Sequence, residues 1–149
     1  MIRELTRREE WVEAFPLMKE LRTHLDLDTY LSLLEEMRPR GYRLFALEES
    51  GRMLALAGVA VMVNLYNGRH LFIYDLVTKE EERSKGYGAK LLRYLEDFAR
   101  AQGCRLVELT SGVRRKEAHR FYEEKMGYTR NSWVFRKRLS PEGKEEGVK

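Results

Sequence analysis

The chain has 149 residues, 43% of them hydrophobic, which is enough for one domain with its own core and without metals or disulfides. Its single cysteine, Cys104, excludes an intrachain disulfide, fits a reducing compartment and is expected to pack rather than to react. The net charge of +4 comes from 28 basic and 24 acidic residues that are interspersed, whereas nucleic-acid binders gather positive charge on one face. No signal peptide is visible, and no apolar run approaches the ~20 residues of a membrane span. We therefore predict a soluble cytoplasmic protein with no nucleic-acid and no membrane partner.

One strand and two helices are expected in the first forty residues. Residues 2–6 favour a short strand. Apolar residues recur at helical spacing over 9–21, where Pro16 predicts a kink or a break. A second helix is expected to begin at Asp26 or Asp28, either of which can cap it, and to run to Met37 before Pro39-Arg40-Gly41 ends it.

The middle of the chain predicts antiparallel strands. Residues 42–48 and 53–64 read as two strands, and Glu49-Ser50-Gly51-Arg52 between them reads as a hairpin turn. Asn67-Gly68, a tight-turn dipeptide, leads into a further strand that ends at Thr78 and is rich in β-branched and aromatic residues.

Helices and strands alternate in the rest of the chain. We expect a helix over 87–102, a strand over 105–110, a helix over 115–125 and a last strand over 132–139. Antiparallel strands followed by β-α-β-α-β predict an α/β fold with a mixed sheet and helices on both of its faces. The chain is interpreted as a single domain, 1–139, followed by a polar and frayed tail, 140–149.

The most informative segment is Arg83-Ser84-Lys85-Gly86-Tyr87-Gly88-Ala89, between a strand and a long amphipathic helix. A glycine-containing turn that opens a helix exposes backbone N–H groups at the positive end of the helix dipole, and these can cradle phosphate oxygens. Gly86 and Gly88 allow a tight turn and the close approach of a ligand. Dinucleotide binding fits less well, because the position three residues after Gly88 is Leu91 and antiparallel hairpins precede the loop.

The same segment matches the R-x-x-G-x-G-A signature of the GNAT N-acetyltransferase superfamily. Further along, residues 118–128 (AHRFYEEKMGY) resemble that family's A-x-x-F-Y-E-x-x-G-F/Y segment, with one extra residue before the glycine. The two motifs stand in the family's order. From about Tyr42 to Leu139 the chain can be laid onto the family's pattern, whereas the first forty residues match only in element type.

This resemblance implies an acyl-coenzyme A N-acyltransferase fold that binds acetyl-coenzyme A. The backbone of Leu76, Val77 and Thr78 would pair with the pantetheine arm. The segment from Arg83 to Ala89 would hold the pyrophosphate, and Arg83 and Lys85 would add positive charge. Arg115 stands where the family often has asparagine and remains a candidate cofactor contact. Tyr122 maps to the family's catalytic tyrosine by its position after Phe121 and before Gly127. A phenol with an ordinary pKa near 10 can give a proton to the departing thiolate.

The general base is left open. Phe72 and Tyr74 occupy positions that are often acidic in relatives, and Asp75, Glu108 and His119 remain candidates. Asp75 is more simply explained as a satisfied structural carboxylate, and His119 is expected to be exposed to solvent. Neither His24 nor His70 has metal-ligand spacing, so no metal is predicted.

Two functions are therefore weighed. The first is an N-acetyltransferase that transfers the acetyl group of acetyl-coenzyme A to a primary amine by direct attack in a ternary complex. The second is a catalytically silent acyl-coenzyme A-binding or regulatory domain. The acceptor, a small-molecule or protein amine, is open, as is the use of other acyl groups. The resemblance implies that the first two helices and residues 65–67 would line the acceptor site. Asp28, Glu35 and Glu36 are best explained as helix surface. Relatives often pair, so a homodimer is compatible with the resemblance.

Overall fold

The computed structural model describes residues 1–140, so all of the predicted tail, 140–149, except its first residue lies outside them. The chain forms two compact units, Met1–Leu109 and the part from Thr110 on. The first unit contains one five-stranded sheet in the order β1-β2-β3-β4-β5. The strands are β1 (Ile2–Leu5), β2 (Arg43–Glu49), β3 (Arg52–Asn64), β4 (Gly68–Thr78) and β5 (Val107–Leu109). Neighbours from β1 to β4 are antiparallel, and β5 runs parallel to β4.

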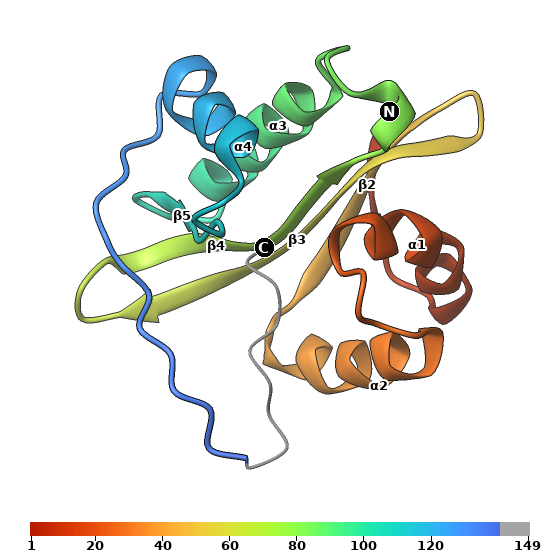
Figure 1. Ribbon diagram of the computed structural model, residues 1–149, viewed down its shortest axis with the longest axis horizontal. Coiled ribbons are helices and arrows are strands. Elements are labelled where there is room, and N and C mark those ends of the chain that lie inside the picture. Colours follow the sequence, from red (N-terminus) through yellow and green to blue (C-terminus); the bar gives the residue numbers. More distant parts are fainter. Residues whose placement is uncertain (141–149) are drawn as a thin grey trace. The chain divides into compact units, whose positions relative to one another are not determined.

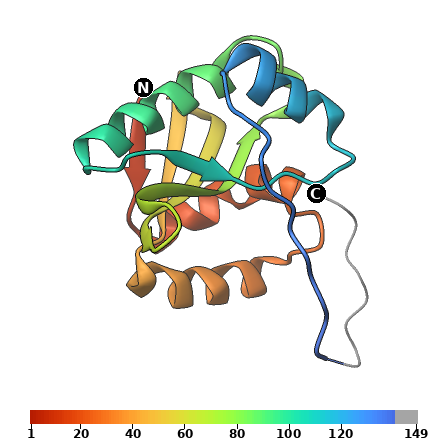
Figure 2. The ribbon, with the colours of Figure 1, turned by 90° about the vertical axis from the view of Figure 1, so that its left-hand side faces the viewer.

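Helices cover both faces of this sheet, as predicted. Helices α1 (Arg8–Leu21) and α2 (Leu27–Met37) lie on one face, and α3 (Tyr87–Ala101) lies on the other (Figures 1 and 2). A strand's side chains alternate between faces, and β2 shows this directly. Leu44 and Ala46 join the core beneath α1 and α2, whereas the Phe45 ring packs on Phe98 of α3 with centroids 5.3 Å apart.

The predicted elements of the first unit are confirmed within a few residues of their expected ends. Asp26 caps α2 by accepting a hydrogen bond from the Thr29 backbone N–H at 2.8 Å, which decides between the two predicted caps. Pro16 lies inside α1 and does not break it. Ser50 and Gly51 adopt φ of 52° and 75° in the β2–β3 turn, which is the backbone geometry of a tight hairpin.

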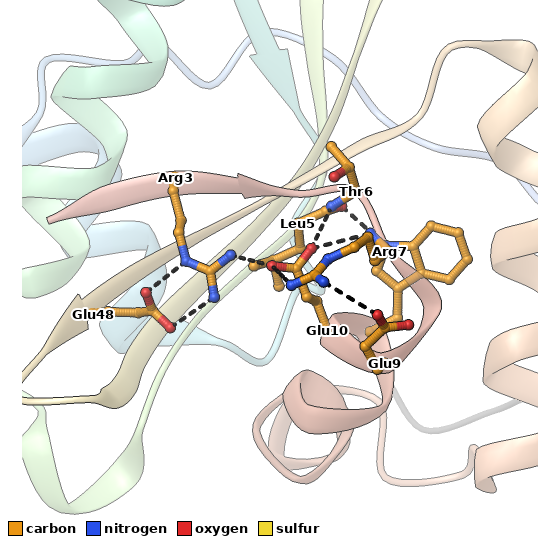
Figure 3. A network of polar contacts seen from close by, with 8 residues as sticks. Arg3, Leu5, Thr6, Arg7, Glu9, Glu10 and Glu48 are labelled. Atoms are coloured by element: carbon orange, nitrogen blue, oxygen red, sulfur yellow. Dashed lines mark hydrogen bonds and ion pairs between the residues drawn. The ribbon is translucent and has the colours of Figure 1, made fainter.

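A network of charged side chains joins β1, α1 and β2 (Figure 3). Glu10 is only 6% exposed, and its Oε1 accepts the backbone N–H groups of Thr6 and Arg7, each at 3.0 Å, at the start of α1. Its other oxygen pairs with Arg3, which also bonds Glu48 of β2 at 2.7 Å. The hydrogen bond from Arg3 is the main cause that lowers the pKa of Glu10 to about 2. A buried carboxylate thus serves as both the helix cap and the link between elements.

The second unit contains a short helix, α4 (Lys116–Arg120), that continues into a π-helical turn, η3 (Phe121–Lys125). The Met126 N–H donates to the Phe121 carbonyl at 3.0 Å, a five-residue step that takes up one residue more than an α-helical turn. Gly127, with φ of 77°, follows at once and ends the helical segment. The extra residue in the second sequence motif is therefore explained by a wide turn.

The predicted last strand, 132–139, is wrong: these residues form no strand. Trp133 and Phe135 are 78% and 94% exposed. Strand-like composition needs a neighbouring edge to pair with, and the sheet's last strand, β5, spans only Val107–Leu109. Over residues 1–140, no helix is both long and apolar enough to cross a bilayer.

Candidate functional site

The end of β4 extends beyond its partner on one side. β5 pairs only with Leu71–Ile73, whereas β4 continues to Thr78 and stays paired with β3 on its other side. Within the first unit, residues 74–78 therefore have a strand neighbour on one side alone. A strand edge of this kind presents N–H and C=O groups to which an extended chain can pair. The predicted contact residues Leu76, Val77 and Thr78 all lie on this stretch.

The loop after β4 has the backbone shape of an anion-binding turn. Ser84 and Gly86 adopt φ of 70° and 88°, while Lys85 between them does not have positive φ. Alternation of this kind turns successive N–H groups toward one concavity. Gly86 is the N-cap of α3 and has no side chain to occupy the N–H groups of Tyr87, Gly88 and Ala89 in the first helical turn. A polyanion placed here would meet N–H donors and the positive end of a 15-residue helix.

The charged side chains of this loop are partly engaged with carboxylates. Lys85 forms an ion pair with Glu82 in the preceding turn, η2 (Glu80–Glu82). This hydrogen bond lowers the pKa of Glu82 and raises the pKa of Lys85. The Tyr87 hydroxyl donates to Glu49 at 3.2 Å. Arg83, Ser84 and Lys85 are all exposed, so their side chains are accessible to a ligand.

A β-bulge lies just before the unpaired stretch. Gly58 pairs with Asp75 and Val59 with Ile73, so Tyr74 is the extra residue on β4. Arg22, the C-cap of α1, clamps this bulge: its Nε donates to Asp75 Oδ1 at 2.9 Å and its Nη2 to the Tyr74 carbonyl at 2.6 Å.

Tyr42 completes the cluster under the bulge, since its hydroxyl donates to Asp75 Oδ2 at 2.7 Å. Burial and the nearby Asp75 carboxylate raise the pKa of Tyr42. A β-carbon at Gly58 would come within 1.7 Å of the Tyr42 hydroxyl oxygen, so this contact requires glycine. Both oxygens of Asp75 are engaged, which confirms the structural explanation of this carboxylate. The sequence shows no signal for this cluster, because Arg22 and Asp75 are 53 residues apart.

A cavity of about 310 Å³ borders the same bulge and is lined by side chains from α1, α2, the loop between them and β4. Aliphatic side chains form much of its wall: Met18, Leu25, Leu33, Leu34 and Met37. Tyr30, Tyr42 and Tyr74 add aromatic surface, and Arg22, His24 and Asp75 carry the titratable groups. A separate cavity of about 210 Å³ lies between α1 and the side chains of Arg52 and Lys79.

The acidic residues of α2 do not line the larger cavity. Glu35 pairs with Arg8, and Glu36 lies 3.9 Å from Arg40. Their interpretation as helix surface is therefore supported. Of the predicted acceptor walls, the first two helices contribute to this cavity, whereas residues 65–67 are not among its lining residues.

Arg115, His119 and Tyr122 lie in the second unit. Arg115 is the N-cap of α4, and its carbonyl accepts the His119 N–H at 3.0 Å. Tyr122 is buried in the π-helical turn, and its ring contacts those of Phe121 and Tyr128 with centroids 5.3 and 6.0 Å away. His119 is half-buried rather than exposed, because its Nε2 lies 2.8 Å from the Gly112 carbonyl, which contradicts the predicted exposure.

The remaining sequence candidates have structural partners. Asn67 Nδ2 donates to Glu108 Oε1 at 2.8 Å, and His70 is buried with its Nδ1 2.9 Å from the Gly68 carbonyl. Burial raises the pKa of the Cys104 thiol, which is the opposite of what an activated nucleophile needs. Among residues 1–140, no three His, Cys, Asp or Glu side chains gather as a metal site.

Two proteins of similar sequence are named as N-acetyltransferases. The protein YhdJ of Bacillus subtilis strain 168, named as an uncharacterized N-acetyltransferase, is 50% identical over 137 residues, which cover 91% of this chain and 96% of that protein. The aminoalkylphosphonate N-acetyltransferase of Salmonella typhimurium is 30% identical over 91 residues, covering 60% of this chain and 58% of that protein.

The fold also resembles that of a solved N-acetyltransferase structure. The aminoglycoside N-acetyltransferase AAC(6')-Iy, in a structure with coenzyme A, superposes with a TM-score of 0.81 at 17% identity and covers 93% of each chain. This likeness shows that the two proteins share a fold. The sequence profile of the GNAT acetyltransferase family matches residues 6–128, and the chain belongs to this family.

Proposed function

We propose that the protein is an N-acetyltransferase that moves the acetyl group of acetyl-coenzyme A to a primary amine by direct attack in a ternary complex. One observation carries the proposal: an unpaired strand edge at 76–78 leads, within a few residues, into a left-handed loop that caps a long helix. An extended thioester arm and a pyrophosphate are the two parts of acyl-coenzyme A that such a segment suits. Membership of the GNAT family and the 50% identity to YhdJ support the reaction class.

The donor would be held mainly by backbone groups. The pantetheine arm would pair with Leu76, Val77 and Thr78 as an added strand. The pyrophosphate would accept N–H groups of Gly86, Tyr87, Gly88 and Ala89. Arg83, Ser84 and Lys85 would contribute exposed side chains, with Lys85 exchanging Glu82 for phosphate. Arg115 is proposed as a further contact on the strength of its place in the family's pattern alone.

The reaction transfers the acetyl group from the thioester sulfur to the amine nitrogen. The amine nitrogen attacks the thioester carbon while a backbone N–H near the bulge stabilises the developing oxyanion. Collapse of the tetrahedral species breaks the C–S bond, and the thiolate takes a proton from the Tyr122 hydroxyl. The amine nitrogen loses a proton to solvent, and the Tyr122 phenolate regains one from solvent. Tyr122 is assigned from the motif between Phe121 and Gly127, not from a placement of one unit against the other.

We also propose that residues 1–139 act as one catalytic domain. The family profile spans 6–128 without a break and so includes parts of both units. The acceptor is proposed to be a small-molecule amine, because two of the similar proteins are named for aminoalkylphosphonate and aminoglycoside acceptors.

Tyr122→Phe separates the enzyme from a silent cofactor-binding domain. Loss of a general acid lowers kcat by about 100-fold or more, while the affinity for acetyl-coenzyme A stays the same. Calorimetry measures the cofactor affinity, and thiol release over an amine panel measures turnover. Cofactor binding without turnover on any amine would favour the silent domain. The absence of cofactor binding would refute both functions.

A further inference from the structure

We infer that the 310 Å³ cavity beside the β4 bulge binds the acceptor, and that this acceptor is a monoamine whose amino group is carried on an aromatic or branched aliphatic body. This inference rests on the proposed function and adds the substrate class. The volume lies at the small end of the range for small-molecule sites.

The position of the cavity is the first argument. Tyr74 and Asp75, which line it, directly precede Leu76, the start of the proposed pantetheine contact. An amine bound in the cavity with its nitrogen toward the bulge would therefore stand next to the strand that carries the thioester.

The lining gives the chemistry of the body. Leu25, Leu33 and Met37 offer aliphatic surface without a polar group, and the Tyr74 ring packs at 5.6 Å from Tyr42 and 5.0 Å from Phe72. Flat aromatic surface and flexible aliphatic side chains favour an apolar or aromatic ligand.

The charges of the lining side chains argue against polyamines and aminophosphonates as acceptors. Asp75 is the cavity's one carboxylate among the described residues, and Arg22 and Tyr42 already occupy both of its oxygens. A polyamine would thus place its second ammonium beside Arg22 and His24 with no carboxylate left for it. Because Arg22 is already paired with Asp75, it would bind a phosphonate more weakly than a free guanidinium would.

An apolar site also favours attack by the amine on the thioester. Desolvation disfavours the ammonium form, so it lowers the pKa of a bound amine and raises the fraction that can attack. This fits a strand that presents Phe72 and Tyr74 rather than acidic side chains beside the bulge.

The test compares five amines of different character at one pH: phenethylamine, isoamylamine, ethanolamine, spermidine and 2-aminoethylphosphonate. Thiol release with acetyl-coenzyme A gives kcat/KM for each. We expect phenethylamine and isoamylamine to exceed ethanolamine by about 10-fold or more, since apolar burial discriminates on that scale. A preference for spermidine or the phosphonate overturns the inference.

Two matched variants locate the site. Leu33→Glu puts a carboxylate on the cavity wall, and Val12→Glu puts one on α1 away from it; Leu33 is 44% exposed and Val12 40%, so neither change disturbs the core. Leu33→Glu should lower the phenethylamine-to-spermidine ratio of kcat/KM by about 10-fold, and Val12→Glu should leave it unchanged. If the phenethylamine-to-spermidine ratio is the same in the wild type and both variants, the acceptor binds elsewhere.

Binding measured without turnover separates this inference from the proposed function. Calorimetry with phenethylamine and coenzyme A should give binding to the wild type and Val12→Glu that weakens in Leu33→Glu. If that pattern appears without turnover on any amine, the catalytic proposal fails and the site stands. If turnover occurs with another preference, only the site's substrate class fails.

Discussion

Arg22, Tyr42 and Asp75 come from distant parts of the sequence, yet their polar atoms satisfy one another beneath β4. Removing one partner leaves a buried group without its hydrogen bond, which costs about 1–3 kcal/mol. We expect Tyr42→Phe and Asp75→Asn each to lower the free energy of unfolding by about 2 kcal/mol. The double variant should lose less than the sum, because both changes break the same bond. Urea unfolding of the four proteins measures this, and strictly additive losses would show that the two residues act separately.

At the scale of an element, the β4 bulge depends on Gly58. A β-carbon there would lie 2.3 Å from Tyr42 Cζ and 2.7 Å from Asp75 Oδ2, so one of these groups must move. Gly58→Ala should therefore destabilise the protein by about 3 kcal/mol, at the upper end of the cost of overpacking a core. It should also weaken turnover, since the bulge adjoins the proposed thioester site.

Gly51→Ala is the comparison for this change. It sits at a hairpin tip with φ of 75° and nothing within 4 Å of a β-carbon. It should cost about 1 kcal/mol from backbone strain alone and leave kcat/KM unaltered. Thermal unfolding and thiol release measure both variants, and a Gly58→Ala protein as stable as wild type would contradict the clash.

Local patterns were sufficient for most elements and for the glycine turn that opens α3. Turn residues, caps and apolar periodicity act over a few positions, so they predicted β1 to β5 and α1 to α3. The Arg22–Asp75 clamp could not be predicted, because it depends on tertiary contacts between elements. The error at 132–139 has the same origin: Trp133, Val134 and Phe135 suit a strand, but a strand forms only where an edge receives it.

For the whole molecule, the loss of folding stability at acid pH should depend on the protonation of Glu10. Its pKa is about 2, below the ordinary value of 4.5, so the folded state binds this proton less readily than the unfolded chain does. The resulting stabilisation is present above about pH 4.5 and is lost as the pH falls toward 2. Glu82 and Asp26, whose pKa values are also lowered, act in the same direction.

Glu10→Gln isolates this contribution. The amide keeps the shape of the side chain but loses the charge that Arg3 and the first turn of α1 bind, so Tm at pH 7 should fall. Below pH 4.5, Tm should then change less steeply than in the wild type. Calorimetric scans from pH 7 to pH 3 measure the two slopes, and parallel curves would exclude Glu10 as the source.

A π-helical turn such as η3 lets a helical segment accommodate one inserted residue, so the insertion does not have to lie in a loop. The additional residue bulges out of the helix, so the positions before it keep their facing and Gly127 still ends the segment. Comparisons that require an unbroken spacing between the tyrosine and the glycine would overlook such a chain.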